Sequence, residues 1–207
     1  HTCEVIPQTE KTKRKGETLM NVLVVGNSSR RNNEVEFAVT QIIPKLARKL
    51  DAGEHRLIFS EDPNSWARKI YEEMKCKENC TLCSTDRKLN CQELDLPREN
   101  FNARSFKSLA QRDEFLYENS EVILALPNSV DALSVVLKGI ERQLQGEEGK
   151  KILIYNLSGC FDKVLEAVDE TVYEGYTQVM STLFYSIAYN EAELMYILSR
   201  FEKELSE

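Results

Sequence analysis

Asn21-Val-Leu-Val-Val-Gly26 is the stretch that decides the fold. It is a continuous apolar run that ends in glycine, and such a run is typical of a strand buried on both faces of a parallel sheet. Working outward, further strands are expected at 56–59, 121–127, 151–156 and 183–188. Apolar residues at helical spacing predict helices at 34–50, 64–74, 105–119, 129–145, 161–174 and 191–205. Strands that alternate with helices in this way predict an α/β fold, a Rossmann-like doubly wound parallel sheet in a single domain.

Length and charge exclude several other classes of protein. A chain of 207 residues is long enough to bury a core of its own, and no stretch approaches the roughly 18 apolar residues that cross a bilayer. The 27 basic and 34 acidic residues give a formal net charge of −7, so we expect no nucleic-acid partner. We therefore expect a soluble cytoplasmic protein without a membrane partner.

Changes in composition along the chain indicate its organisation. Residues 1–19 carry the basic run Lys11, Lys13, Arg14 and Lys15 with little apolar content, which indicates a flexible basic tail. The folded domain is expected at 20–207. Within it, a cysteine-rich insert is expected at about 75–103, where helical and strand periodicity lapses.

The loops that follow the strands are the candidate binding residues, because ligands of doubly wound sheets bind at the carboxyl ends of the strands. Gly26, Asn27, Ser28 and Ser29 follow the first strand and precede a helix. Small side chains and free N–H groups at a helix start suit a nucleotide phosphate, but the same residues also suit a plain capped turn. Both interpretations remain open from the local sequence. Asn128 and Ser129 follow the strand predicted at 121–127 and stand in the same relation to the helix predicted at 129–145.

Four segments carry a resemblance to a known family. They are Gly26-Asn-Ser-Ser29, Glu121-Val-Ile-Leu-Ala-Leu-Pro127, Asn156-Leu-Ser-Gly-Cys-Phe-Asp-Lys-Val-Leu165 and Ala167-Val-Asp-Glu-Thr-Val-Tyr-Glu-Gly-Tyr176. Through these segments the chain resembles the lonely guy (LOG) family of cytokinin-activating phosphoribohydrolases. With gaps, the resemblance runs from residue 20 onward, and it is poor at about 60–103. It implies a homodimer and hydrolysis of the N-glycosidic bond of a nucleoside 5′-monophosphate, with no organic cofactor.

The family motif is only partly kept, which implies a degenerate site. The family arginine, which contacts the phosphate, corresponds to the retained Arg112, and its lysine neighbour is replaced by Asp113. The positions of the family's phosphate-loop glycines, threonine and catalytic glutamate are occupied by Asn128, Ser129, Asp131, Ala132 and Val135. Asp131 lies one helical turn before Val135 and is a candidate replacement carboxylate. A helix-dipole partner is the simpler role for it.

Cys76, Cys80, Cys83 and Cys91 lie close together in the poorly matched segment. The Cys80-Thr-Leu-Cys83 spacing is that of a metal knuckle, and four thiolates would enclose a structural Zn²⁺ ion. Two disulfides or four free thiols are the alternatives, and an iron–sulfur cluster is a weaker one.

Three functions therefore remain for the sequence. The first is a LOG-like nucleotide-binding protein whose phosphoribohydrolase site is weak or inactive. The second is an active nucleoside 5′-monophosphate phosphoribohydrolase with a rearranged site. The third is a zinc-stabilised scaffold for protein interactions.

Overall fold

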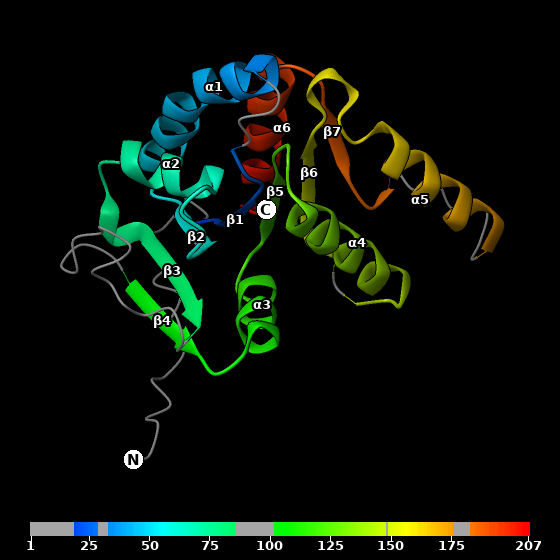
Figure 1. Ribbon diagram of the computed structural model, residues 1–207, viewed down its shortest axis with the longest axis horizontal. Helices are drawn as coiled ribbons and strands as arrows, with labels where there is room; N and C mark the ends of the chain where they lie inside the picture. The colour runs from blue at the N-terminus through cyan, green and yellow to red at the C-terminus, as the bar shows by residue number, and fades with distance from the viewer. Residues whose placement is uncertain (1–18, 29–32, 86–101, 148, 176–182) are drawn as a thin grey trace.

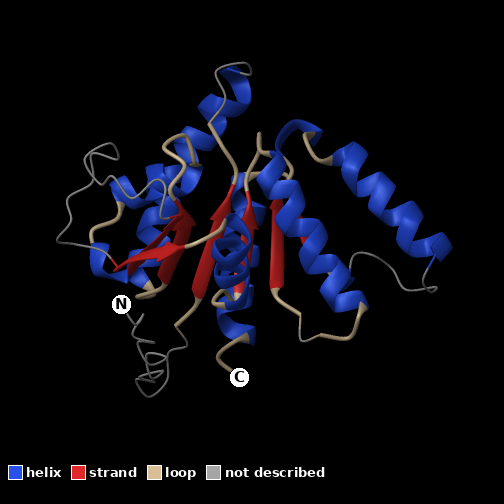
Figure 2. Ribbon diagram, turned by 60° about the horizontal axis from the view of Figure 1, so that its bottom comes forward, coloured by secondary structure: helices blue, strands red, loops and turns tan. Residues whose placement is uncertain are grey.

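A computed structural model describes residues 19–28, 33–85, 102–147, 149–175 and 183–207. It contains a seven-stranded parallel sheet in the order β4-β3-β2-β1-β5-β6-β7, with helices on both faces (Figures 1 and 2). The predicted α/β, Rossmann-like, doubly wound fold is confirmed. The strands are β1 (Asn21–Val25), β2 (Arg56–Ser60), β3 (Cys80–Thr85), β4 (Asn102–Phe106), β5 (Val122–Ala125), β6 (Lys151–Tyr155) and β7 (Ser186–Ala188). The helices are α1 (Asn33–Ala52), α2 (Trp66–Glu73), α3 (Leu109–Glu118), α4 (Val130–Leu144), α5 (Asp162–Gly175) and α6 (Glu191–Glu204), with the short 3-10 helices η1 (Lys77–Asn79) and η2 (Leu157–Gly159).

The central strand β1 shows why an unbroken apolar run forms here. It pairs in parallel with β2 on one side and β5 on the other, so that Leu23 lies opposite both Ile58 and Ile123. Alternate residues of a strand point to opposite faces. Val22 therefore packs in the cluster built with α1, α2 and α6, and Leu23 in the cluster built with α3, α4 and α5. Both faces need apolar side chains, because each is covered by helices.

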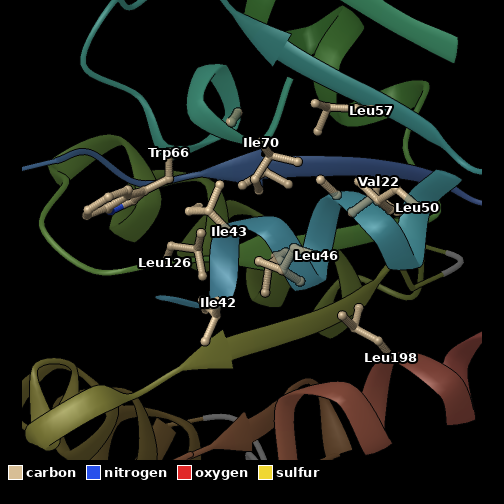
Figure 3. Close-up of a cluster of buried hydrophobic side chains, with 14 of the residues drawn as sticks. Val22, Ile42, Ile43, Leu46, Leu50, Leu57, Trp66, Ile70, Leu126 and Leu198 are labelled. Atoms are coloured by element: carbon tan, nitrogen blue, oxygen red, sulfur yellow. The ribbon is translucent and has the colours of Figure 1, made fainter. Parts of the chain in front are cut away.

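The larger core cluster lies on the face of α1, α2 and α6 (Figure 3). Ile43 and Leu46 of α1 and Ile70 of α2 are at most 3% exposed there. Leu198 of α6 is 2% exposed in the same cluster. Side chains of this size each contribute about 1.5–3 kcal/mol when fully buried. The helical periodicity seen in the sequence thus corresponds to the stripe that each helix buries.

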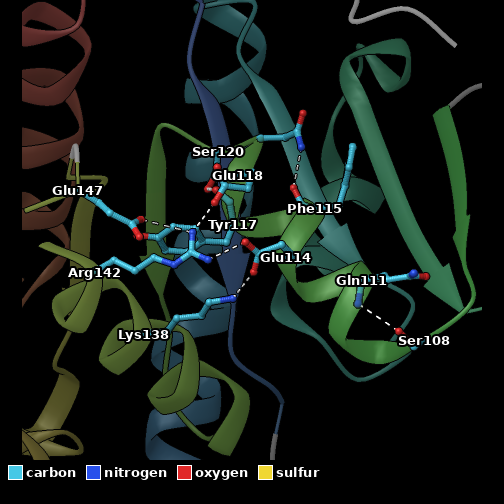
Figure 4. A network of polar contacts seen from close by, with 11 residues as sticks. Ser108, Gln111, Glu114, Phe115, Tyr117, Glu118, Ser120, Lys138, Arg142 and Glu147 are labelled. Carbon is cyan, nitrogen blue, oxygen red and sulfur yellow. Dashed lines mark hydrogen bonds and ion pairs between the residues drawn. The ribbon is translucent and has the colours of Figure 1, made fainter. Parts of the chain in front are cut away.

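On the opposite face, ion pairs hold α3 against α4 (Figure 4). The Glu114 carboxylate accepts bonds from Lys138 Nζ and Arg142 Nη2, each at 2.6 Å. Arg142 also pairs with Glu118, and its guanidinium lies 4.5 Å from the centre of the Tyr117 ring. Helix α3 also carries Arg112, so this network helps to hold the helix from which Arg112 reaches Glu61 at the end of β2.

The described part of the segment predicted as a cysteine-rich insert contributes to the sheet. It provides strand β3, an interior strand that pairs with β2 from Leu57 opposite Cys80 to Ser60 opposite Cys83. It also includes the start of β4, the strand at the edge of the sheet. Neither strand shows an apolar run, because β3 consists mainly of cysteine, serine and threonine, and β4 is largely exposed. The strand pattern on which the prediction relied is therefore absent from both.

Candidate ligand-binding site

The strand order reverses between β1 and β5, which is where a doubly wound sheet usually holds its ligand. Here the loops after these two strands touch each other. Gly26 adopts a φ of +128°, and a Cβ atom at this position would lie 2.3 Å from the Leu126 carbonyl oxygen. The Asn27 N–H donates a hydrogen bond of 3.2 Å to the Pro127 carbonyl. Only glycine permits this backbone contact, which closes the base of the crevice.

Trp66, at the start of α2, fastens both loops. Its backbone N–H donates to the Gly26 carbonyl at 3.0 Å, and its indole Nε1–H donates to the Pro127 carbonyl at 3.1 Å. The side chain is completely buried. The helix is started by Ser65, whose hydroxyl accepts a hydrogen bond from the Arg68 N–H. One residue thus fixes the spacing of the two loops that flank the switch point.

Asn27 and Ser28, two predicted nucleotide-binding residues, lie at this edge with their polar groups engaged. The Asn27 side chain donates to Asp62 at 2.8 Å, and the Ser28 N–H donates to the Asn64 carbonyl at 2.8 Å. A phosphate would need to break the second bond to use that N–H group. Ser29 lies outside the described residues.

A cation also lies beside Ser28. Lys69 Nζ is 3.1 Å from Ser28 Oγ and 3.0 Å from Glu36 Oε1, and it sits 4.5 Å from the centre of the Trp66 ring. The Glu36 carboxylate accepts the Ser28 hydroxyl as well. The positive charge is therefore balanced by a carboxylate within the protein.

The loop after β5 places the other predicted residues at the start of α4. Asn128 adopts a φ of +71°, and Ser129 caps the helix by accepting a bond of 3.0 Å from the Asp131 N–H. This cap occupies an N–H group of the kind that binds a phosphate at a helix start. Asp131 is exposed, and Val135, one turn further, packs against the core cluster of that face.

A cleft of about 30 Å³ lies between these loops. This volume holds about one or two water molecules, so a larger ligand must extend out of it across the carboxyl edge. The cleft is lined by Leu23, Val24, Val25, Gly26, Asn27, Ser60, Ser65, Leu116 and Asp131. Gly26, Asn27 and Asp131, three of the predicted site residues, thus line one cavity.

Arg112 lies next to this cleft, but its guanidinium is paired. Nη1 is 3.2 and 3.3 Å from the two Glu61 oxygens, and Nη2 and Nε are 2.7 and 2.9 Å from Asp113 Oδ1. The Glu61 side chain is only 3% exposed and that of Arg112 14%. Burial by itself lowers the pKa of Arg112, but the bonds and charges of Asp113 and Glu61 outweigh burial and raise it.

The predicted zinc ligands do not meet in the described part of the chain. Cys80 packs in the cluster beneath α1 and α2, with its sulfur 3.7 Å from that of Met74, whereas Cys83 packs in the cluster beneath α3. They lie on opposite faces because they are three residues apart in one strand. Burial raises the pKa of both thiols to about 12.

The remaining cysteines leave the zinc prediction untested. Cys76 precedes η1, where its N–H donates to Asp51 at 3.1 Å, and Cys91 lies outside the described residues. Among the residues that the structure describes, no group of three or more histidine, cysteine, aspartate or glutamate side chains is placed to hold a metal ion. A single ion bound by both Cys80 and Cys83 would require β3 to rearrange.

Sequence reasoning missed four residues that shape this edge: Glu36, Glu61, Trp66 and Lys69. The sequence did contain an indication of Glu61, because it is a charged residue directly after an apolar strand. Side chains at that position meet at the carboxyl edge of the sheet. Glu36 and Lys69 look like ordinary exposed helix residues in the sequence. Their contact depends on the packing of α1 against α2.

These features define a class of protein. It is a doubly wound α/β domain whose carboxyl edge has the position of a ligand site, and several hydrogen-bonding groups at this edge are bonded to other residues of the chain. No family model matches the chain, and the search of curated proteins found no match. Solved structures do resemble it. The Moco carrier protein of Chlamydomonas reinhardtii has a TM-score of 0.60 at 10% identity, covering 90% of this chain and 99% of that one.

Two further structures extend this likeness. The molybdenum cofactor binding protein of the phototrophic bacterium Rippkaea orientalis has a TM-score of 0.59 at 11% identity, covering 88% of this chain and 97% of that one. The structural-genomics target TM1055 has a TM-score of 0.55 at 13% identity, covering 88% and 99%. At such identities the likeness establishes the fold alone, which is a Rossmann-like α/β fold. No helix among the described residues is both long and apolar enough to span a membrane.

Proposed function

We propose that this chain is a LOG-like nucleotide- or nucleoside-binding protein whose phosphoribohydrolase activity is lost or very weak. The observation that carries the proposal is Val135. By the resemblance it stands where the family has its catalytic glutamate, and its side chain packs against the hydrophobic cluster under α4.

The chemistry explains why this residue matters. Cleavage of an N-glycosidic bond passes through an oxocarbenium-like state, which needs a carboxylate near the sugar. Loss of a general acid or base typically slows a reaction by about 10²- to 10⁴-fold. An apolar side chain that packs against the core offers neither a negative charge nor a proton.

Binding is supported by what the edge retains. The cleft at the switch point combines apolar walls from β1 and Leu116 with polar groups from Asn27, Ser60 and Asp131. Small-molecule sites have this mixture of residue types, and a cleft of about 30 Å³ would hold one part of such a ligand. Two of the similar structures are named as a carrier protein and a binding protein of the molybdenum cofactor. Their names support a role for this fold in holding a small ligand.

A second candidate function is favoured by one observation. Asp131 is exposed and lines the cleft, so a carboxylate is present although not at the family's position. In this alternative, Asp131 acts as the acid or base of a rearranged hydrolase.

Two measurements separate these functions. Chromatographic assay of base release from AMP is expected to give no rate above the buffer control, and titration calorimetry with adenosine and AMP is expected to show binding of at least one. Base release that disappears in Asp131→Asn would establish the second candidate instead. If neither ligand binds, a non-binding scaffold replaces the proposal.

The homodimer, the cytoplasmic location and the zinc ion stay predictions. Light scattering on the purified chain measures the first, and metal analysis the last. Zinc in stoichiometric amount would favour the interaction scaffold, because the metal would then stabilise the surface formed by the cysteine-rich segment.

A further inference from the structure

We infer that Glu61 is a specificity-determining residue, which makes the carboxyl-edge site reject ligands that bring a phosphate or another anion to Arg112. The ligand class that follows is an uncharged nucleoside-like molecule rather than a nucleotide. This inference rests on the proposed function and specifies its ligand.

The pair of Arg112 and Glu61 is part of the site by its position. Glu61 directly follows Ser60, and Arg112 lies one helical turn before Leu116 on the same face of α3. Both Ser60 and Leu116 line the cleft. The pair is therefore adjacent to two lining residues of the cleft, on the side of α3.

The donors of Arg112 are already used by carboxylates of the chain. A guanidinium suits both carboxylate and phosphate oxygens, so the two kinds of group compete for the same N–H groups. Here Nη1 faces both oxygens of Glu61 at 3.2 and 3.3 Å, while Nε and Nη2 face Asp113. Arg112 thus contacts two internal anions at once.

Burial makes Glu61 a stronger competitor than a surface carboxylate would be. Its side chain is 3% exposed, so it cannot turn into water when a phosphate arrives. Displacing it would leave a buried carboxylate without its cation, which is among the costliest changes in a protein interior. The neighbouring charges of Asp113 and Asp131 repel an anion further.

The same contacts show what happens when Glu61 loses its charge. Arg104 of β4 stacks on Phe115 of α3, with its guanidinium carbon 4.7 Å from the ring centre. Arg104 lies opposite Cys83 of β3, and Cys83 lies opposite Ser60, the residue before Glu61. Arg104 and the pair of Glu61 and Arg112 are therefore at the same end of the sheet. Without the Glu61 charge, Asp113 is the one carboxylate of these contacts that still pairs with Arg112, and Nη1 becomes open to a phosphate oxygen.

The decisive experiment compares Glu61→Gln with the wild-type chain by calorimetric titration of AMP and adenosine. Glutamine keeps the size and a hydrogen-bond acceptor, so the change is mainly one of charge. We expect affinity for AMP to rise about tenfold, the effect of removing one nearby like charge, and affinity for adenosine to change less than about twofold.

Two further variants serve as controls. Glu72→Gln removes the same charge from the exposed face of α2, where Glu72 pairs with Arg68, and should leave both affinities unchanged. The double variant Glu61→Gln/Arg112→Gln should lose the gain in AMP affinity, because the guanidinium that binds the phosphate is then missing.

Each outcome decides the inference. A wild-type chain that binds AMP more tightly than adenosine overturns it, and so does a folded Glu61→Gln chain without a gain. If Glu61→Gln fails to fold, Asp113→Asn removes the other, exposed carboxylate from the same arginine, and absence of any gain in AMP affinity there refutes the inference. If the wild type binds neither ligand, the proposed function fails, while titration of the variants with inorganic pyrophosphate still tests the role of Glu61.

Discussion

Replacement of Gly26 by alanine is expected to lower the free energy of unfolding by about 4 kcal/mol. A side chain at a φ of +128° strains the backbone, which costs about 2 kcal/mol. The added Cβ would also lie 2.3 Å from the Leu126 oxygen and 2.8 Å from its carbonyl carbon, both backbone atoms that cannot turn away. The loops after β1 and β5 must then separate. They would lose the bonds from Leu126 N to the Val25 carbonyl and from Asn27 N to the Pro127 carbonyl, each worth about 1 kcal/mol.

A matched control isolates the contact from the strain. Gly146 also has a positive φ, +86°, but a Cβ atom there would meet nothing within 4 Å. Gly146→Ala should therefore cost only the backbone strain, about 1–2 kcal/mol. Urea unfolding followed by circular dichroism measures both variants. If Gly26→Ala loses no more stability than Gly146→Ala, the loops are not in the tight contact described, and the argument for a closed crevice base is refuted.

Three further predictions concern charge, thiols and metal. Bonds from Lys138 and Arg142 lower the pKa of Glu114 to about 2, so this carboxylate contributes stability above its ordinary pKa that is lost as the pH falls toward 2. Arg142→Ala should therefore flatten the decline of melting temperature between pH 5 and pH 2, and parallel curves for the two chains would contradict this. Burial raises the pKa of the Cys80 and Cys83 thiols to about 12, so mass spectrometry should find both alkylated far more slowly at pH 8 in the native than in the unfolded chain; equal rates would refute their burial. If the predicted zinc ion is bound, treatment with EDTA should lower the melting temperature, and an unchanged melting temperature would refute a stabilising metal.

The fold was predictable where burial leaves a pattern in the chain. β1, β5 and β6 lie inside the sheet with helices on both faces, and their sequences are accordingly continuous apolar runs. The helices were predictable because each buries one stripe. α3 was placed less well, since the prediction began it at residue 105, within β4, whereas it starts at Leu109.

The site was predictable only in part, because its chemistry depends on contacts between distant residues. The resemblance drew attention to Arg112, but the sequence alone could not show that Glu61, 51 positions away, would pair with it. In the same way, the spacing of Cys80 and Cys83 is that of a metal knuckle, but the sequence alone could not show that both residues lie in strand β3, on opposite faces of the sheet. Their placement there depends on pairing with β2, a tertiary contact.

The way that Trp66 ties the two switch-point loops together has a practical consequence. It is the one tryptophan in the chain, and its buried indole is bonded to the carbonyl of Pro127. The intrinsic fluorescence of the unlabelled protein therefore comes from the point where a ligand would have to part the loops. Exposure of the Trp66 indole to water would shift its emission to longer wavelength. An ordinary fluorimeter can therefore screen compounds for binding between the loops after β1 and β5.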